Sequence, residues 1–223
     1  MSEKKSTIGI PGYKLGENSF GCGINHLDFI SQFGNPKILF PQDKDEKLDL
    51  LYLPGGADTN PSTYGQIPGF YTSNQDVFKQ YFFDNNLKSY IESGIRVVGV
   101  CLGFQMLNVY FNGTITQNLR YHAQSEDRWK PAHEVKFFED SKKKFKVNSH
   151  HHQGITLKDL SSELTPLLYA DNEEDKNNPI IEAFQHKELP IIAFQYHCEE
   201  WRDSYSMRKI SELLLYSTKN ILS

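Results

Sequence analysis

The sequence has few cysteines, no long apolar run and no excess of basic residues. It contains only three cysteines in 223 residues, and no segment approaches the ~20 consecutive apolar residues of a membrane span. Residues 1–13 are charged and have no apolar stretch long enough for a signal peptide. We therefore expect no membrane insertion, a cytoplasmic location and reduced thiols.

The charge balance argues against binding to nucleic acid or to an anionic membrane surface. The formal net charge is −4, and basic residues form no stripe along the chain. Aromatic residues make up 13% and charged residues 23% of the chain, as in an ordinary globular protein. This length fits one large domain, so we expect residues 1–223 to form a single unit.

Apolar segments alternate between strand-like and helix-like patterns in the first half of the chain. This alternation predicts an α/β fold with a mostly parallel central sheet flanked by helices. The second half predicts additional antiparallel strands and a closing helix. The expected strands are 7–10, 37–41, 48–56 and 95–100, the expected helices are 24–33, 75–93, 102–112 and 204–219, and short strands and a hairpin are expected within 114–147 and 180–197.

A cysteine lies at the junction of one expected strand and the next helix. The stretch "GVCLG" places Cys101 between Gly99 and Gly103, the G-x-C-x-G form of a nucleophile elbow. Glycines suit such a turn because backbone segments pass close to one another there. The helix N-terminus would stabilise a thiolate, and the amide of Leu102 would face an oxyanion. The competing interpretation is a buried structural cysteine.

A cysteine nucleophile needs a base and a group that orients it. In "AFQYHCEEW", His197 follows an apolar strand and Glu199 comes two residues later. If the strand continues, these two side chains share one face, so Glu199 can hold the imidazole while Cys198 points away. Glu200 is out of phase and is the weaker candidate.

A run of histidines in "VNSHHHQG", residues 147–154, raises the question of a metal site. Adjacent histidines point in different directions, and no Cys, Asp or Glu at ligand spacing surrounds them. We therefore expect no metal here, and interpret the run as a polar loop that lines a substrate site.

Four motifs in this order resemble those of the class I glutamine amidotransferase-like proteins, especially the gamma-glutamyl-gamma-aminobutyrate hydrolase-like branch. The resemblance covers residues 7–202. It implies a flavodoxin-like fold and catalysis by a Cys-His-Glu triad without metal or organic cofactor. The motifs are "LPGGADTNPSTYG", "GVCLGFQMLNVYFNGTITQNL", "VNSHHHQ" and "IIEAFQHKELPIIAFQYHCEEW".

The resemblance also implies a role for individual residues. Cys101 would be the nucleophile, His197 the base and Glu199 its orienter, and the backbone amides of Gly56 and Leu102 would form the oxyanion hole. The implied substrate-binding residues are Gly55, Gln105, Ser149, His151, His152 and Gln153.

One position departs from the family pattern. The family usually has His-Pro-Glu where this chain has His197-Cys198-Glu199. Cysteine lacks the fixed φ of proline and keeps a backbone donor, so the segment should be looser. We expect Cys198 to face away from Cys101 and to form no disulfide with it.

The expected reaction is hydrolysis of a γ-glutamyl amide, with a small γ-glutamyl compound or glutamine as substrate. Two alternatives stay open: a glutaminase that passes ammonia to a separate synthetase, and an inactive ligand-binding protein. The "NSHHHQ" loop resembles the hydrolase branch more than the partnered subunits. The leaving-group pocket is expected to involve segments 12–23, 59–65 and 120–130. A homodimer also stays open. Tyr71 and Phe82–Phe83 are candidates for an interface, although such aromatic residues are more often part of the core.

Overall fold

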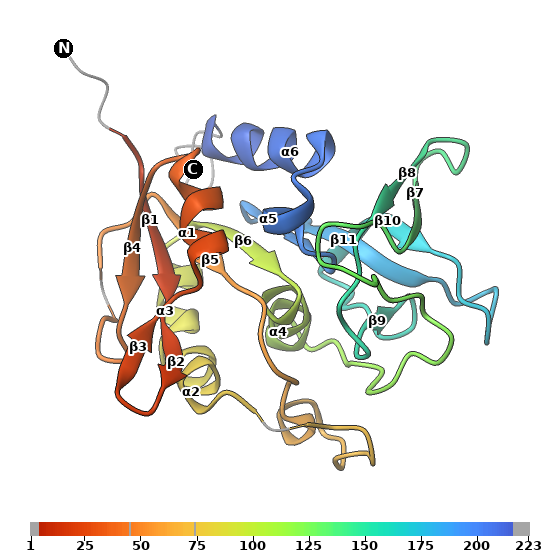
Figure 1. Cartoon of the computed structure of the whole chain (residues 1–223), viewed down its shortest axis with the longest axis horizontal. Helices are drawn as coiled ribbons and strands as arrows, with labels where there is room; N and C mark the ends of the chain where they lie inside the picture. Colours follow the sequence, from red (N-terminus) through yellow and green to blue (C-terminus); the bar gives the residue numbers. More distant parts are fainter. Residues whose placement is uncertain (1–4, 45, 74, 216–223) are drawn as a thin grey trace.

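The computed structural model describes residues 5–44, 46–73 and 75–215, and in them one large sheet runs through the molecule (Figure 1). The strand order across it is β4-β1-β5-β6-β12-β11-β10-β7-β8, and β9 pairs with β11 at one side. The strands of this sheet are β1 (Thr7–Pro11), β4 (Asn35–Leu39), β5 (Leu50–Leu53), β6 (Arg96–Val100), β7 (His133–Phe137), β8 (Lys144–Val147), β9 (Ile155–Thr156), β10 (Leu164–Ala170), β11 (Ile180–His186) and β12 (Ile191–Phe194).

The first part of the sheet is parallel, as predicted from the alternating pattern. All pairings from β4 through β1, β5 and β6 to β12 are parallel. Numbered in chain order, these strands lie 2-1-3-4-5 across the sheet, which is the flavodoxin-like order. In such sheets ligands bind beyond the carboxyl ends of the strands, near the point where the order reverses. That point lies between β1 and β5.

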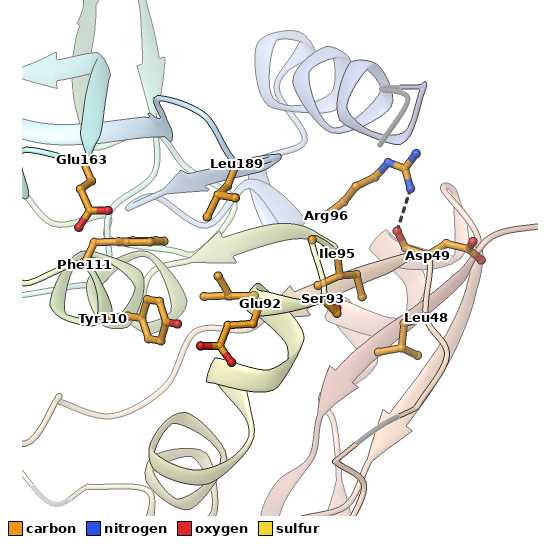
Figure 2. Close-up of a pocket in the computed structure, with 12 residues that line it drawn as sticks. Leu48, Asp49, Glu92, Ser93, Ile95, Arg96, Tyr110, Phe111, Glu163 and Leu189 are labelled. Carbon is orange, nitrogen blue, oxygen red and sulfur yellow. Dashed lines mark hydrogen bonds between the residues drawn. The ribbon is translucent and has the colours of Figure 1, made fainter. Parts of the chain in front are cut away.

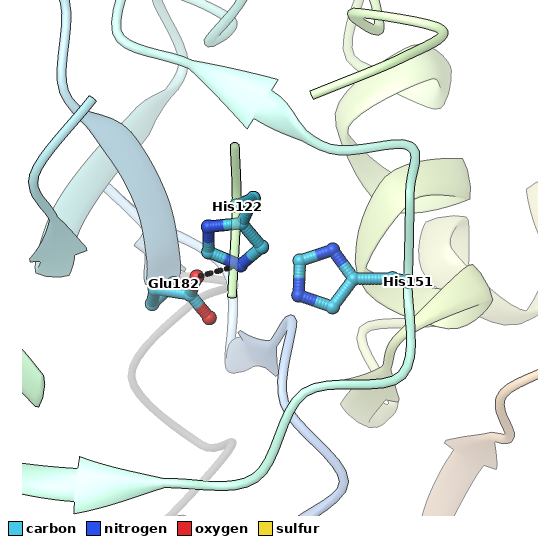
Figure 3. A group of neighbouring side chains, drawn as sticks. All are labelled: His122, His151 and Glu182. Atoms are coloured by element: carbon cyan, nitrogen blue, oxygen red, sulfur yellow. Dashed lines mark ion pairs between the residues drawn. The ribbon is translucent and has the colours of Figure 1, made fainter. Parts of the chain in front are cut away.

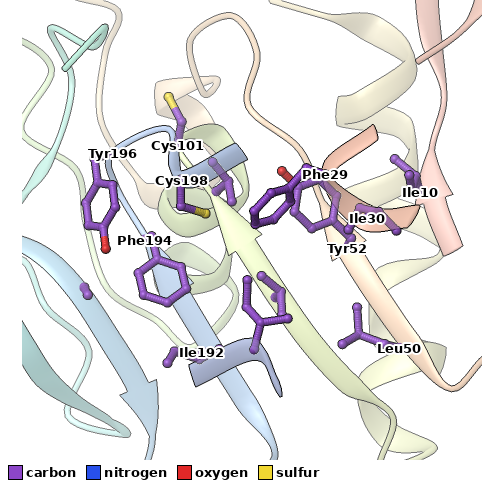
Figure 4. Packing of buried hydrophobic residues seen from close by; sticks show 14 of the residues in the cluster. Ile10, Phe29, Ile30, Leu50, Tyr52, Cys101, Ile192, Phe194, Tyr196 and Cys198 are labelled. Carbon is purple, nitrogen blue, oxygen red and sulfur yellow. The ribbon is translucent and has the colours of Figure 1, made fainter. Parts of the chain in front are cut away.

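Helices cover both faces because the buried strands are apolar on both sides. In β5, Leu50 and Tyr52 pack in one core with Phe29 of α1, whereas Leu51 and Leu53 pack in a second core with helices α2, α3 and α4 (Figures 1 and 4). The helices are α1 (Ile24–Ser31), α2 (Val77–Asn85), α3 (Leu87–Glu92), α4 (Leu102–Tyr110), α5 (Cys198–Trp201) and α6 (Ser204–Leu215). None of the described helices is long and apolar enough to cross a lipid bilayer.

The remaining strands extend the sheet with antiparallel pairings. The expected hairpin forms, with β11 antiparallel to β12 and a turn at 187–190. Strands β10, β7 and β8 follow in antiparallel order. The sequence patterns did not single out β10, whose alternation is interrupted by Pro166 and a register shift.

Three predicted segments differ from the structure. The loop after β1 contains a hairpin, β2 (Tyr13–Gly16) and β3 (Ser19–Gly21). The single helix expected over 75–93 is divided at Asn86, whose buried side chain donates to the carbonyls of Pro41 and Asp43 at 3.1 and 3.2 Å. The helix expected over 204–219 runs to Leu215, and 216–219 lie outside the described residues.

Candidate active site

Cys101 occupies a sharp turn between β6 and α4 at the carboxyl edge of the parallel sheet. Its φ of 51° lies in the left-handed region, which is strained for a residue with a side chain. A Cβ atom on Gly103 would collide with the carbonyl oxygen of Leu53, and one on Gly99 would lie 2.8 Å from the backbone of Gly103. The two glycines therefore let strand, turn and helix approach closely, as the elbow pattern predicted.

His197 contacts both Cys101 and Glu199. Its ring interacts with the Cys101 side chain, and its Nδ1 donates to Oε1 of Glu199 at 2.7 Å. Burial acts to lower the pKa of His197, but its interactions with Glu199 and Cys101 outweigh burial, and the pKa is raised well above its ordinary value. The arrangement therefore favours the protonated imidazolium form of His197.

The His197–Glu199 contact was predicted, but the structural reason was wrong. The strand ends at Phe194, and His197 is the N-cap of the short helix α5. Glu199 lies in the first helical turn and folds back to the imidazole. Glu199 is fully buried, which acts to raise its pKa, but His197 and His26 lower it below the ordinary value.

Cys198 is the first residue of α5, and its sulfur points into the core, away from Cys101 (Figure 4). All three cysteines are free. Burial raises the pKa of the Cys198 thiol well above its usual range, so this thiol is a poor nucleophile.

A second histidine, which the sequence analysis missed, lies on the far side of Glu199. His26 of α1 has its Nδ1 3.1 Å from the hydroxyl of Tyr52 and 3.6 Å from Oε1 of Glu199. Burial lowers the pKa of His26 to about 4, so its ring is neutral near neutral pH. Tyr52, whose hydroxyl contacts His26, is itself fully buried.

Lys79 is a further buried group that sequence reasoning did not find. Its side chain lies under the loop that follows β5, and its Nζ donates to the carbonyl of Gly55. The ammonium also sits 3.8 Å from the centre of the Tyr13 ring. Burial lowers the pKa of Lys79 despite the nearby Asp76, which caps α2 and accepts from the Lys79 amide at 3.1 Å.

Gly55 and Gly56 pass close to Cys101, Leu102 and His197. A Cβ on Gly55 would lie 2.8 Å from Cε1 of His197 and 3.3 Å from Cβ of Cys101. A Cβ on Gly56 would lie 2.8 Å from Cδ2 of Leu102. A side chain at either position would collide with a neighbour, so only glycine fits. The peptide groups of Gly55 and Gly56 can therefore lie beside the Cys101 thiol.

A cavity of about 350 Å³ adjoins His197. Its lining carries two basic residues, Lys79 and Arg128, and three acidic residues, Asp76, Glu199 and Glu200. Arg128 pairs with Glu200, with Nη1 3.0 Å from Oε1. The full lining is Tyr13, Asn25, His26, Gly55, Gly56, Ala57, Asp76, Lys79, Arg128, His150, His197, Glu199 and Glu200. Segments 12–23 and 120–130 thus contribute to it as expected, but 59–65 does not.

Most of the expected substrate-binding side chains lie outside this cavity, although Gly55 lines it. Gln105 is buried, and its amide donates to the carbonyl of Gln153 at 3.1 Å and to the side chain of Gln195 at 3.2 Å. The side-chain oxygen of Gln153 accepts from the Thr59 amide at 3.3 Å. Ser149 is fully buried, and its hydroxyl has no hydrogen-bond partner among the described residues.

The three adjacent histidines point in three directions, as predicted. The ring centre of His150 lies 6.1 Å from that of His197, whereas Nε2 of His152 lies 3.0 Å from Oδ1 of Asp58. His151 turns the other way and does not line the cavity. The ring of His150 therefore lies beside His197, and the ring of His152 lies beside Asp58. The ring of His151 lies in a separate group of side chains with His122 and Glu182.

A separate hollow of about 780 Å³ lies at the opposite edge of the sheet (Figure 2). It surrounds Arg96, the first residue of β6, whereas Cys101 follows the last residue of that strand. Arg96 donates from Nη1 to the carbonyl of Asp49 at 3.3 Å. No cysteine or histidine lines this hollow, so it does not share the thiol chemistry of the other edge.

Comparisons with known proteins place the chain in a family. Residues 38–199, more than two thirds of the chain, match the family model described as Peptidase C26. The chain belongs to this family. It is 31% identical over 212 residues to YvdE of Lactococcus lactis, described as glutamine amidotransferase-like, with 86% of each chain covered. The superfamily expected from the sequence motifs is confirmed.

One solved structure and one further sequence relative are also similar to this chain. A crystal structure of a glutamine amidotransferase from Thermotoga maritima superposes with a TM-score of 0.57 at 16% identity, covering 94% of this chain and 82% of that one. This likeness confirms the fold. A carbamoyl phosphate synthase small chain of Metallosphaera sedula is 23% identical over 181 residues, 80% of this chain and 42% of its own length. Membership of the Peptidase C26 family supports the conclusion that the protein is a hydrolase-type enzyme.

Proposed function

We propose that the protein hydrolyses a γ-glutamyl amide through a γ-glutamyl thioester on Cys101. The observation that carries the proposal is the contact of His197 with both Cys101 and the buried carboxylate of Glu199. A strained elbow, a helix N-terminus and a raised imidazole pKa together are what a cysteine nucleophile needs.

In the first half of the reaction, the Cys101 thiolate attacks the side-chain amide carbon and forms a C–S bond. The carbonyl π electrons move to oxygen, and the amides of Gly56 and Leu102 hold that oxyanion. When the oxyanion collapses, the C–N bond breaks. His197 gives its proton to the departing amine, and Glu199 keeps the ring oriented.

In the second half, His197 is neutral and takes a proton from water as the water attacks the thioester carbon. The C–S bond then breaks, glutamate leaves, and Cys101 and His197 return to the thiolate–imidazolium pair. Nucleophile, acid and base are all side chains of this chain.

Lys79 supports the assignment of Gly56 to the oxyanion hole. In a trans peptide group, the carbonyl and the following amide point in opposite directions. Because the ammonium of Lys79 binds the Gly55 carbonyl from one side, the Gly56 amide is directed to the other. Lys79 is therefore a positioning residue for that amide.

A glutaminase role with a separate synthetase is the second candidate. It is favoured by an exposed apolar group on the loop between β5 and α2. Ile67 is 87%, Phe70 95% and Tyr71 61% exposed. The side chain of Gln117 holds this loop, accepting from the Gly69 amide at 2.6 Å. The small-chain relative from Metallosphaera is in keeping with such an arrangement. The loop would then be the contact surface for the partner.

A glutamate-release assay on the purified protein tests the proposal and separates the candidates. It uses glutamine and a panel of γ-glutamyl amines, with Cys101→Ala as the blank. Release from a γ-glutamyl amine but not from glutamine is the expected result. Release from glutamine alone would favour the partnered glutaminase. No release from any compound, with ligand binding retained, would favour an inactive binding protein.

A further inference from the structure

A second group of histidines lies away from Cys101, at the junction of the antiparallel strands with the histidine loop (Figure 3). We call it the histidine–glutamate cluster. It consists of His122, from the segment after α4, His133, the first residue of β7, His151, from the loop 148–154, and Glu182 of β11.

The side chains of the cluster converge on the Glu182 carboxylate. Oε1 of Glu182 lies 3.4 Å from Nε2 of His122 and 3.2 Å from Nε2 of His133. Ligand atoms of His122, His151 and Glu182 all lie within 4.8 Å of one another. The ring centres of His122 and His151 are 4.8 Å apart. Three groups of metal-ligand type therefore lie close together, and His133 approaches the same oxygen of Glu182 from another side.

The cluster is buried, yet its polar atoms are unsatisfied. Glu182 is fully buried, and the side chains of His122 and His133 are only 3% and 13% exposed. Within the described residues, both oxygens of Glu182 lack hydrogen-bond partners, as do Nε2 of His122, both ring nitrogens of His133 and Nε2 of His151. Buried polar groups without well-formed hydrogen bonds are costly, and the two imidazoles near Glu182 make contacts that do not satisfy them.

The separations fit a metal ion. Ligand atoms ~2.1 Å from a tetrahedral Zn²⁺ lie about 3.4 Å from one another, close to the two N···O distances at Glu182. His151 donates from Nδ1 to the carbonyl of Gln153 at 2.9 Å, which leaves Nε2 as the free ligand atom.

We propose that the histidine–glutamate cluster is a closed binding site for one divalent transition-metal ion, best suited to Zn²⁺. His122, His151 and Glu182 supply three ligand atoms, and His133, whose Nε2 contacts the same carboxylate oxygen, would move in as the fourth, which makes the site structural rather than catalytic. A cavity of about 350 Å³ that reaches His122 and His133 gives the ion a path from solvent. The proposal does not depend on the reaction at Cys101.

The ion would join four separate parts of the chain. His133 and Glu182 belong to strands β7 and β11 of the sheet, His122 to the segment after α4, and His151 to the histidine loop. Its hydrogen-bond partner, the Gln153 carbonyl, also accepts from Gln105 of α4. Metal binding would thus fix the loop that borders the catalytic helix.

Metal analysis of tag-free protein provides the test. The protein is stripped with a chelator, dialysed and titrated with Zn²⁺ or with Co²⁺, whose visible absorption reports tetrahedral coordination. We expect one ion per chain and a rise in Tm of roughly 5–15 °C on metal addition. His122→Gln and His133→Gln should each lose the ion and the shift. His186→Gln, a matched change at another buried histidine of β11, should keep both.

Two results would overturn the proposal. In the first, the stripped protein binds neither Zn²⁺ nor Co²⁺ and its Tm does not shift. The side chains of the cluster would then be stabilised by a shared proton and not by a metal ion. The second result is equal metal binding by His122→Gln, His133→Gln and His186→Gln, which would show adventitious binding elsewhere. If His122→Gln fails to fold, His133→Gln, at the more exposed ring, decides between the outcomes.

Discussion

Nδ1 of His197 lies 2.7 Å from Oε1 of Glu199, and the carboxylate is completely buried. In the proposed reaction His197 transfers protons, whereas Glu199 only orients the ring. We expect His197→Asn to lower kcat roughly 10⁴-fold or more, and Glu199→Gln to lower it less, roughly 10²–10³-fold. Steady-state kinetics with Glu163→Gln as the matched control checks the order. Equal losses for both variants would contradict the separate roles.

Lys79→Met tests the oxyanion hole without touching the triad. Methionine keeps the length of the buried side chain but removes the donor to Gly55. Because the amide of Gly56 would lose its fixed direction, kcat should fall roughly 10–100-fold while KM changes little. Lys88→Met, at an exposed lysine of α3, is the control. A raised KM with unchanged kcat would instead make Lys79 a substrate-binding group.

Cys198→Pro tests the departure from the family pattern. Cys198 is the first residue of α5, where proline is well accommodated. The change removes one backbone donor, from Cys198 to the Tyr196 carbonyl at 3.1 Å. We expect activity to be preserved or raised, measured as kcat/KM at equal folded concentration. Complete loss of activity in a folded variant would mean that this chain uses the cysteine itself.

His26→Gln tests the acid sensitivity of the fold. The pKa of His26 is about 4 in the folded chain, below its ordinary value of 6.5. Between these values the unfolded chain binds more protons, so stability present at neutral pH is lost as pH falls from 6.5 towards 4. From pH 7.5 to 4.5 the free energy of unfolding of the variant should decline by about 2 kcal/mol less than that of the wild type. Denaturant titrations at the two pH values measure this difference, and equal declines would contradict the buried, neutral state of His26.

Local patterns gave the parallel half of the fold and the position of Cys101. The strand-turn-helix at "GVCLG" could be predicted because glycine spacing and apolar runs act over a few residues. The β10 strand was missed because Pro166 and a register shift interrupt its pattern. The break at Asn86 was missed for a different reason, since its side chain binds carbonyls some forty residues away.

The parts of the site that were missed depend on distant partners. Lys79 had no local signal, because its contacts with Tyr13 and Gly55 arise only when α2 packs under the loop after β5. His26 lay in an ordinary amphipathic helix. Likewise, the approach of Glu182 to His122 and His133 had no local signal, because Glu182 comes from another strand.

Trapping of an acyl-enzyme shows whether Cys101 forms a γ-glutamyl thioester. The protein is mixed with a γ-glutamyl amine, quenched in acid within the first turnovers and measured by intact-mass spectrometry and peptide mapping. The account predicts a mass increase of one glutamyl group on the peptide that contains Cys101, reversed by hydroxylamine and absent in Cys101→Ser, which should also lose roughly 10⁴-fold or more in turnover. Turnover without any adduct, near-normal activity of Cys101→Ser, or an adduct on Cys22 or Cys198, would contradict it.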